Sequence, residues 1–153
     1  MIPAIAVTSL HAHVGEELGV SEWLEITQHR IDTFADATDD RQWIHVDGAR
    51  AALESPFKTT IAHGFLTLSL ISVLLRSALS VDGCRMALNY GLNRVRFVAP
   101  VPVDSRVRGR FVLSALEEAA DGAVQVTWST TVEREGAEKP CCVAEWIVRY
   151  YPS

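Results

Sequence analysis

The sequence predicts an α+β fold in which an antiparallel sheet wraps around one long buried helix. Helical periodicity dominates the first half of the chain, and short alternating segments follow from Met86 onward. Helices grouped before consecutive strands are typical of α+β folds. The run Phe65–Leu79 is apolar around nearly the whole circumference of a helix, as expected of a helix that is buried on all sides. A sheet wrapped around that helix satisfies both observations.

The composition indicates one globular domain. The chain has 153 residues, of which 48% are hydrophobic and 22% charged, so we expect a single domain over residues 1–153. Its net charge of −5 argues against nucleic-acid binding, which needs a cationic surface to displace counterions. The apolar run contains Arg76 and falls short of the ~20 apolar residues that span a bilayer, so no membrane partner is expected.

Two further features indicate the compartment. The first residues lack a basic stretch followed by an apolar run, so no secretory signal is expected. The three cysteines are an odd number and show no zinc-site spacing, so neither a disulfide framework nor a metal site is predicted. We therefore expect a reduced, cytoplasmic, metal-free protein.

The helical half follows from periodicity and end signals. Apolar residues recur at helical spacing between Ile31 and Thr38, which predicts an amphipathic helix over Gln28–Thr38. Thr27 is expected to cap it, because a threonine hydroxyl accepts from an unpaired amide of the first turn. Asp39–Asp40 ends the pattern. The other elements predicted here are a strand at Val20–Ile26 and a short helix at Ala49–Glu54, closed by Pro56.

The second half is predicted to form strands. Hydrophobic and polar residues alternate with the period of two that a half-buried strand requires. Pro100 and Pro102 separate the first two strands, and Glu135–Gly136 marks a turn between the last two. The predicted strands are Arg94–Val98, Arg106–Val112, Val124–Val132 and Cys142–Tyr150.

Asp40 and His45 are the first candidates for chemistry. They are five residues apart, which suits neither one face of a helix nor one face of a strand. They meet only if the residues between them form a turn, and a turn carried by a rigid helix often holds catalytic groups. A carboxylate and an imidazole that meet there can hold one water and share its protons. From spacing alone, a solvated acid and a loop histidine remain the favoured alternative.

Gly64 is the second candidate. It begins the apolar helix, where amides have no internal acceptor. A carbonyl that develops negative charge would be stabilised by such an amide, and glycine allows close approach. The preceding His63 either lines the same site or makes a structural hydrogen bond at the helix entrance, which is the favoured interpretation.

Other stretches complete a recognisable pattern: Ile44–Asp47, His63–Gly64, Tyr90–Phe97 and Pro100–Val103. Together with Asp40 and the apolar helix, they resemble the MaoC-like (R)-specific enoyl-CoA hydratases, a family with the hot-dog fold. The phrase Gln42–Asp47 is most similar to the nodulation-protein-N-like branch. The resemblance implies a single hot-dog domain and reversible syn-hydration of a trans-2-enoyl-CoA to the (R)-3-hydroxyacyl-CoA.

The resemblance also implies roles for individual residues. Asp40 and His45 match the catalytic pair, Gly64 matches the glycine whose amide receives the thioester oxygen, and Ser72 matches a serine that hydrogen-bonds near the pair. From its position alone, Ser72 is as easily explained by a bond to its own helix. The family pattern further implies no cofactor beyond the CoA thioester substrate, and a homodimer with sheets joined edge to edge.

One segment departs from the family pattern. Much of the family has Asp-x-Asn-Pro-x-His, whereas Arg41–Ile44 lies between the pair here. Without Asn-Pro, the turn has to be held by other contacts. Trp43 is expected to narrow or reshape the acyl entrance, which bears on chain length more than on the reaction.

Arginines recur at positions 94, 96, 106, 108 and 110, all even, so within each strand they share one face. A solvated outer face of the sheet accounts for most of them. Arg94 and Arg96 are the better candidates for contacts to the CoA phosphates, because guanidinium groups pair well with phosphate.

Two other functions stay open at this point. A hot-dog thioesterase would use the same helix terminus with a carboxylate that attacks, or activates water, at C1. A non-catalytic acyl-CoA-binding module would hold the ligand without turning it over, and would leave Asp40 and His45 without a purpose.

Overall fold

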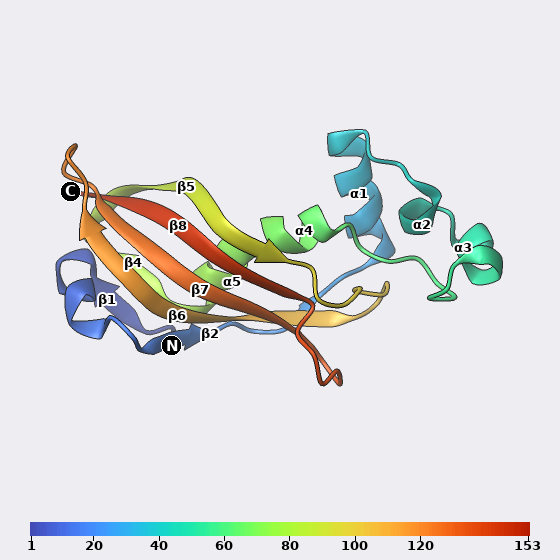
Figure 1. The fold of residues 1–153 in the computed structure, drawn as a ribbon, viewed down its shortest axis with the longest axis horizontal. Coiled ribbons are helices and arrows are strands. Elements are labelled where there is room, and N and C mark those ends of the chain that lie inside the picture. Colours follow the sequence, from blue (N-terminus) through green and yellow to red (C-terminus); the bar gives the residue numbers. More distant parts are fainter.

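A computed structural model describes all residues from 1 to 153 and contains a six-stranded antiparallel sheet (Figure 1). The strand order is β2-β6-β7-β8-β5, and β3 also pairs with β6. The strands are β1 Ala4–Ala6, β2 Glu17–Val20, β3 Leu24–Glu25, β4 Ser80–Asp82, β5 Cys84–Arg96, β6 Arg106–Glu118, β7 Val124–Arg134 and β8 Cys142–Pro152. The helices are a 3-10 helix at Val7–His13, α1 Gln28–Thr38, α2 Trp43–Val46, α3 Gly48–Glu54, α4 Gly64–Ser69 and α5 Ile71–Ala78.

The core lies between α5 and the sheet, as the α+β prediction requires (Figure 1). Leu74 of α5, Phe111 of β6 and Trp128 of β7 are all at most 1% exposed. Phe111 and Trp128 meet edge to face with ring centroids 6.4 Å apart, a favourable arrangement of aromatic quadrupoles. Full burial of each such side chain stabilises the fold by about 1.5–3 kcal/mol.

The predicted apolar helix is present but interrupted. Its helical turns divide at Leu70, whose amide is shared between the carbonyls of Leu66 and Thr67. Burial on all sides holds for α5 only in part, because Arg76 is exposed, and at the other end Phe65 of α4 is 66% exposed. The prediction from apolar composition that this segment is buried on all sides was therefore only partly correct.

The helical first half follows the prediction closely. α1 has the expected bounds, and the Thr27 hydroxyl accepts from the Arg30 amide at 3.1 Å. Asp39 ends the helix in the left-handed region with φ 60°. α3 begins at Gly48, one residue before the predicted start, with Asp47 as its cap. The three helices α1–α3 extend beyond one end of the sheet (Figure 1).

The prediction of one strand over Val20–Ile26 was wrong. β2 ends at Val20 and β3 begins at Leu24. Between them, the buried Ser21 hydroxyl accepts from the Gly109 amide at 2.8 Å, and the Ser21 amide donates to the Gly109 carbonyl at 2.9 Å. The short parallel pairing of β1 with β4 was not predicted either.

The sheet has two edges, formed by the long strand β5 on one side and by the short strands β2 and β3 on the other. β5 pairs only with β8, whereas the outer side of β6 is covered by β2 and β3. β6, β7 and β8 contain the strands predicted for them and extend beyond them, whereas β5 begins ten residues before the predicted Arg94–Val98 and ends at Arg96, two residues short of it. None of the helices is long and apolar enough to cross a bilayer.

Candidate active site

The segment after α1 brings Asp40 and His45 together. Arg41 and Gln42 bend the chain, and His45 then lies on the single turn of α2. One oxygen of Asp40 and one ring nitrogen each of His45 and His63 lie within 4.8 Å of one another. Asp40 is exposed, whereas both histidines are buried. A water molecule fits between groups at this separation, with the carboxylate on its solvent side.

His45 is held in one tautomer. Its Nδ1 lies 2.7 Å from the Ile61 carbonyl oxygen, and because a carbonyl only accepts, Nδ1 carries the proton. Nε2 is therefore left with its lone pair. Burial lowers the pKa of His45 and outweighs the opposing effects of the Ile61 bond and the Asp40 charge. The imidazole is thus kept neutral and able to accept a proton near pH 7.

His63 connects the parts of the site. Its Nε2 donates to the Asp40 backbone carbonyl at 2.8 Å, and its ring stacks on that of His45 with centroids 3.8 Å apart. Phe34 of α1 covers it at 4.9 Å. Both alternatives for His63 are therefore present together: it makes a structural hydrogen bond to Asp40, and one of its ring nitrogens lies within the same cluster as Asp40 and His45. The stacking on His45 was not predicted, because contacts across a turn leave no periodic signal.

Gly64 lies where a side chain would be crowded. An added Cβ would lie 3.0 Å from the ring of Phe97, closer than carbon atoms normally approach. Gly64 is also the first residue of α4. Its amide therefore has no hydrogen-bond acceptor within the helix. α4 has only six residues, so the stabilisation of an oxyanion would come from the amide itself more than from a long helix dipole.

His45 and Gly64 line one pocket of about 310 Å³. Its walls are mostly apolar and include Phe57, Phe97 and the buried thiol of Cys141. Burial raises the pKa of Cys141 to about 12, so this thiol is a packing group and not a nucleophile. The pocket can therefore enclose an apolar acyl group next to one imidazole and one free amide.

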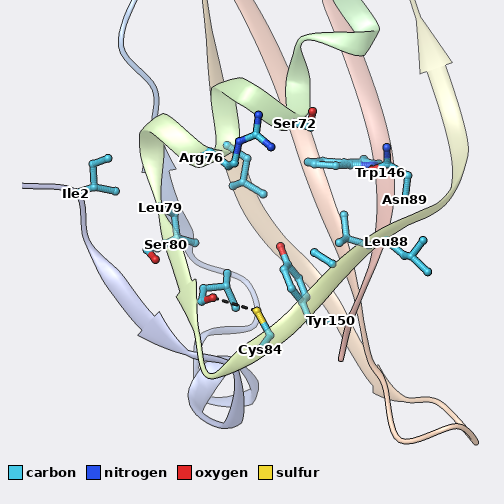
Figure 2. Close-up of a pocket in the computed structure, with 14 residues that line it drawn as sticks. Ile2, Ser72, Arg76, Leu79, Ser80, Cys84, Leu88, Asn89, Trp146 and Tyr150 are labelled. Atoms are coloured by element: carbon cyan, nitrogen blue, oxygen red, sulfur yellow. Dashed lines mark hydrogen bonds between the residues drawn. The ribbon is translucent and has the colours of Figure 1, made fainter. Parts of the chain in front are cut away.

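Two residues that were predicted to belong to the site, Ser72 and Trp43, do not line this pocket. Ser72 does not line the pocket of His45 and Gly64; it lines a second cavity between α5 and β5 (Figure 2). Trp43 lies on α2, next to the pair in sequence, but its ring is covered by the guanidinium of Arg50 at 4.3 Å. Neither side chain is brought to the pocket within this chain.

The arginines fall into two groups. Arg106, Arg108 and Arg110 of β6 pair with glutamates across the sheet, with two of them sharing Glu133. The solvated-face interpretation explains these three. Arg94 and Arg96 on β5 are exposed and pair with no acid, so their guanidinium groups remain available to an anion.

The Asp40, His45 and His63 cluster fits a metal ion poorly. The two imidazole planes are only 24° from parallel, so their in-plane lone pairs run side by side and do not converge. One nitrogen of each ring is also committed to a backbone carbonyl. The donor set suits a bound water better than a tetrahedral cation.

Comparisons with known proteins extend these observations. A family profile described as "MaoC like domain" matches residues 9–135. The chain is 57% identical over 145 residues to 3-hydroxyacyl-thioester dehydratase Z of Mycobacterium tuberculosis, covering 95% of each. It is 49% identical over 144 residues to nodulation protein N of Rhizobium leguminosarum bv. viciae, covering 94% of this chain and 89% of the relative. The solved R-hydratase PhaJ1 from Pseudomonas aeruginosa matches with a TM-score of 0.71 and 26% identity, covering 92% of this chain and 83% of that one.

Proposed function

The chain belongs to the MaoC-like dehydratase family, and we propose that Asp40, His45 and the Gly64 amide carry out its reaction. The protein is a hydro-lyase, an (R)-specific enoyl-CoA hydratase that interconverts trans-2-enoyl-CoA and (R)-3-hydroxyacyl-CoA. One observation supports the assignment of residues above all others. A neutral imidazole with a free Nε2 lies beside a carboxylate and lines the same pocket as an unpaired amide.

The Gly64 amide polarises the substrate in this proposal. It donates to the thioester oxygen, which draws electron density from the conjugated double bond and makes C3 electrophilic. The apolar walls of the pocket strengthen that hydrogen bond, because they exclude competing water. Glycine suits this position, since a Cβ here would crowd the ring of Phe97.

The pair then handles the water. His45 Nε2 takes a proton as the water oxygen bonds to C3, and the electrons of the double bond move to the thioester oxygen at Gly64. Asp40 accepts a hydrogen bond from the second O–H of the water, whose hydrogen stays on the new hydroxyl group. Its charge also favours the imidazolium, an effect that acts on His45 in this geometry. The imidazolium returns its proton to C2 on the same face. Atoms and charges balance without a cofactor or metal.

The chain is also proposed to act as a homodimer. The exposed apolar side chains Met86, Leu88, Tyr90 and Leu92 lie along β5, whose outer edge has no partner strand. An apolar unpaired edge normally joins another strand, so we propose a homodimer with β5 paired to β5. Arg94 and Arg96 would then lie near the subunit boundary, where they can hold the CoA phosphates. The three free cysteines support the cytoplasm as the compartment.

The test is a spectrophotometric assay of the purified chain with enoyl-CoA substrates of increasing length. Loss of the enoyl-thioester absorbance, with chiral analysis giving the (R)-alcohol, supports the proposal. Release of free thiol without loss of the enoyl absorbance would indicate the thioesterase instead. Saturable binding with no turnover of any length would indicate a binding module.

A further inference from the structure

A second and larger cavity, of about 590 Å³, lies between α5 and β5 (Figure 2). Ten of its 14 lining residues are hydrophobic, including Leu75 of α5 and Val148 of β8. It shares no lining residue with the pocket of His45 and Gly64. The mechanism above leaves this cavity without a role.

The polar groups of the cavity are hydrogen-bond donors. Arg76 lines it and forms none of the ion pairs of the protein, and the Ser72 hydroxyl makes no bond to its own helix. The Asn89 carbonyl oxygen accepts from Trp146 Nε1 at 3.2 Å, which leaves the Asn89 amide hydrogens free. Tyr150 accepts from Trp128 Nε1 at 3.2 Å, which leaves its own hydroxyl hydrogen free.

No carboxylate lines the cavity to balance these donors. The position of Arg76 in the last turn of α5 explains a positive charge there, since cations stabilise helix C-termini. It does not explain the hydroxyl and amide donors around the same space. Tyr150 in particular stays protonated at neutral pH, because burial raises its pKa to about 12.

We propose that this cavity binds an apolar chain that ends in a carboxylate. The chain packs against Leu75 and Val148, and the carboxylate accepts hydrogen bonds from Arg76 and Ser72, which project from successive turns of α5 (Figure 2). A guanidinium and a hydroxyl together satisfy both oxygens of a carboxylate. The protein carries a net charge of −5, so an anion would be drawn to this point only by a local cation.

Two sources supply this chemistry. One is a free aliphatic carboxylate. The other is the distal end of an acyl thioester whose reacting end lies in the Gly64 pocket of this chain or of a paired copy, and this second source rests on the proposed function. The two are separated by different measurements.

The first measurement is equilibrium binding of decanoate by titration calorimetry, without any thioester. Arg76→Gln should weaken binding about tenfold or more, because a hydrogen bond to a charged group is lost. Ser72→Ala should weaken it less. Decanol should bind no more weakly to Arg76→Gln than to the wild type. The matched control is Arg30→Gln, which removes an exposed arginine outside the cavity and should leave binding unchanged.

The second measurement compares two enoyl-CoA substrates of equal length, one ending in a methyl group and one in a carboxylate. The ratio of their kcat/KM values should favour the carboxylate in the wild type and fall about tenfold in Arg76→Gln. Turnover of the methyl-terminated substrate by all variants would show that the hydratase assignment holds whatever the ratio does.

The proposal is overturned if decanoate affinity and the kcat/KM ratio are both insensitive to Arg76 in folded protein. A change in affinity alone assigns the cavity to a free carboxylate, and a change in the ratio alone assigns it to the substrate terminus. If no variant hydrates either thioester, the proposed function fails, and decanoate binding decides this proposal by itself.

Discussion

The imidazole rings of His45 and His63 stack with centroids 3.8 Å apart and an angle of 24° between their planes. His63 at the same time donates to the backbone of Asp40 and immediately precedes Gly64. One buried side chain therefore contacts both Asp40 and His45, the proposed reacting pair, and adjoins the Gly64 amide that is proposed to bind the thioester oxygen. The three proposed functional groups come from separate segments of the chain, and His63 contacts or adjoins each of them.

Substitution of His63 tests that positioning role. His63→Phe keeps a ring against His45 but loses the bond to Asp40, so kcat should fall about tenfold with little change in KM. The decline of kcat at low pH should also begin at a higher pH in this variant, because His63 contributes to lowering the pKa of His45. The measurement is a set of pH profiles of kcat and KM. Loss of thermal stability with unchanged kinetics would indicate a packing residue only.

Substitution of the reacting pair should abolish most turnover. Asp40→Asn and His45→Gln should each reduce kcat on crotonyl-CoA by about 10² or more, because each removes a group that holds or moves a proton. The control is Asp39→Asn, an adjacent exposed acid with φ 60°, a conformation that asparagine tolerates. Wild-type rates in both pair variants, with the folded state verified by circular dichroism, would remove them from the mechanism.

Gly64→Ala should impair both folding and catalysis. The new methyl group would lie 3.0 Å from Phe97, and displacement of that ring should cost about 1–3 kcal/mol in the free energy of unfolding. Adding Phe97→Leu should restore stability and part of the activity. Gly48→Ala is the control, since nothing lies within 4 Å of its added Cβ. Denaturant titrations measure the difference, and equal effects of the two alanines would contradict the steric argument.

The pH dependence should reflect the lowered pKa of His45, which burial causes. A neutral base keeps kcat/KM constant above the usual value of 6.5, and the rate should decline only below it. The free energy of unfolding should also fall at low pH. Below pH 6.5 the unfolded chain binds a proton at His45 more tightly than the folded chain does, so stability is lost as the pH falls through the folded-state pKa. Rates and melting temperatures measured over the same pH range separate the two effects. An acid limb above 6.5 would contradict a buried neutral imidazole.

Charge on the free edge of the sheet should separate the proposed dimer. Leu88→Asp combined with Leu92→Asp places two carboxylates on the exposed side chains of β5 and should convert the dimer to monomer, because like charges would face each other across the pairing. Light scattering after size exclusion gives the mass. Leu53→Asp on α3, which is 80% exposed in wild type, is the matched control and should remain dimeric.

Local chemistry made much of this protein predictable from its sequence. The bounds of α1, its Thr27 cap and its end at Asp39 depend on hydrogen bonds and periodicity within a few residues. The odd spacing of Asp40 and His45 likewise allowed them to meet only across a bend, and the structure has that bend. The four long strands followed from alternation alone, although their lengths did not.

Only the tertiary structure decided the rest, because those features depend on partners far apart in the chain. The strand expected across Val20–Ile26 is divided where Ser21 bonds to Gly109, a residue 88 positions away. Ser72, expected near the reacting pair, lies on the wall of a different cavity. His63 acquired its role from a ring that packs on it across a turn. Local sequence patterns do not indicate such contacts, because they join residues that come together only when the chain folds.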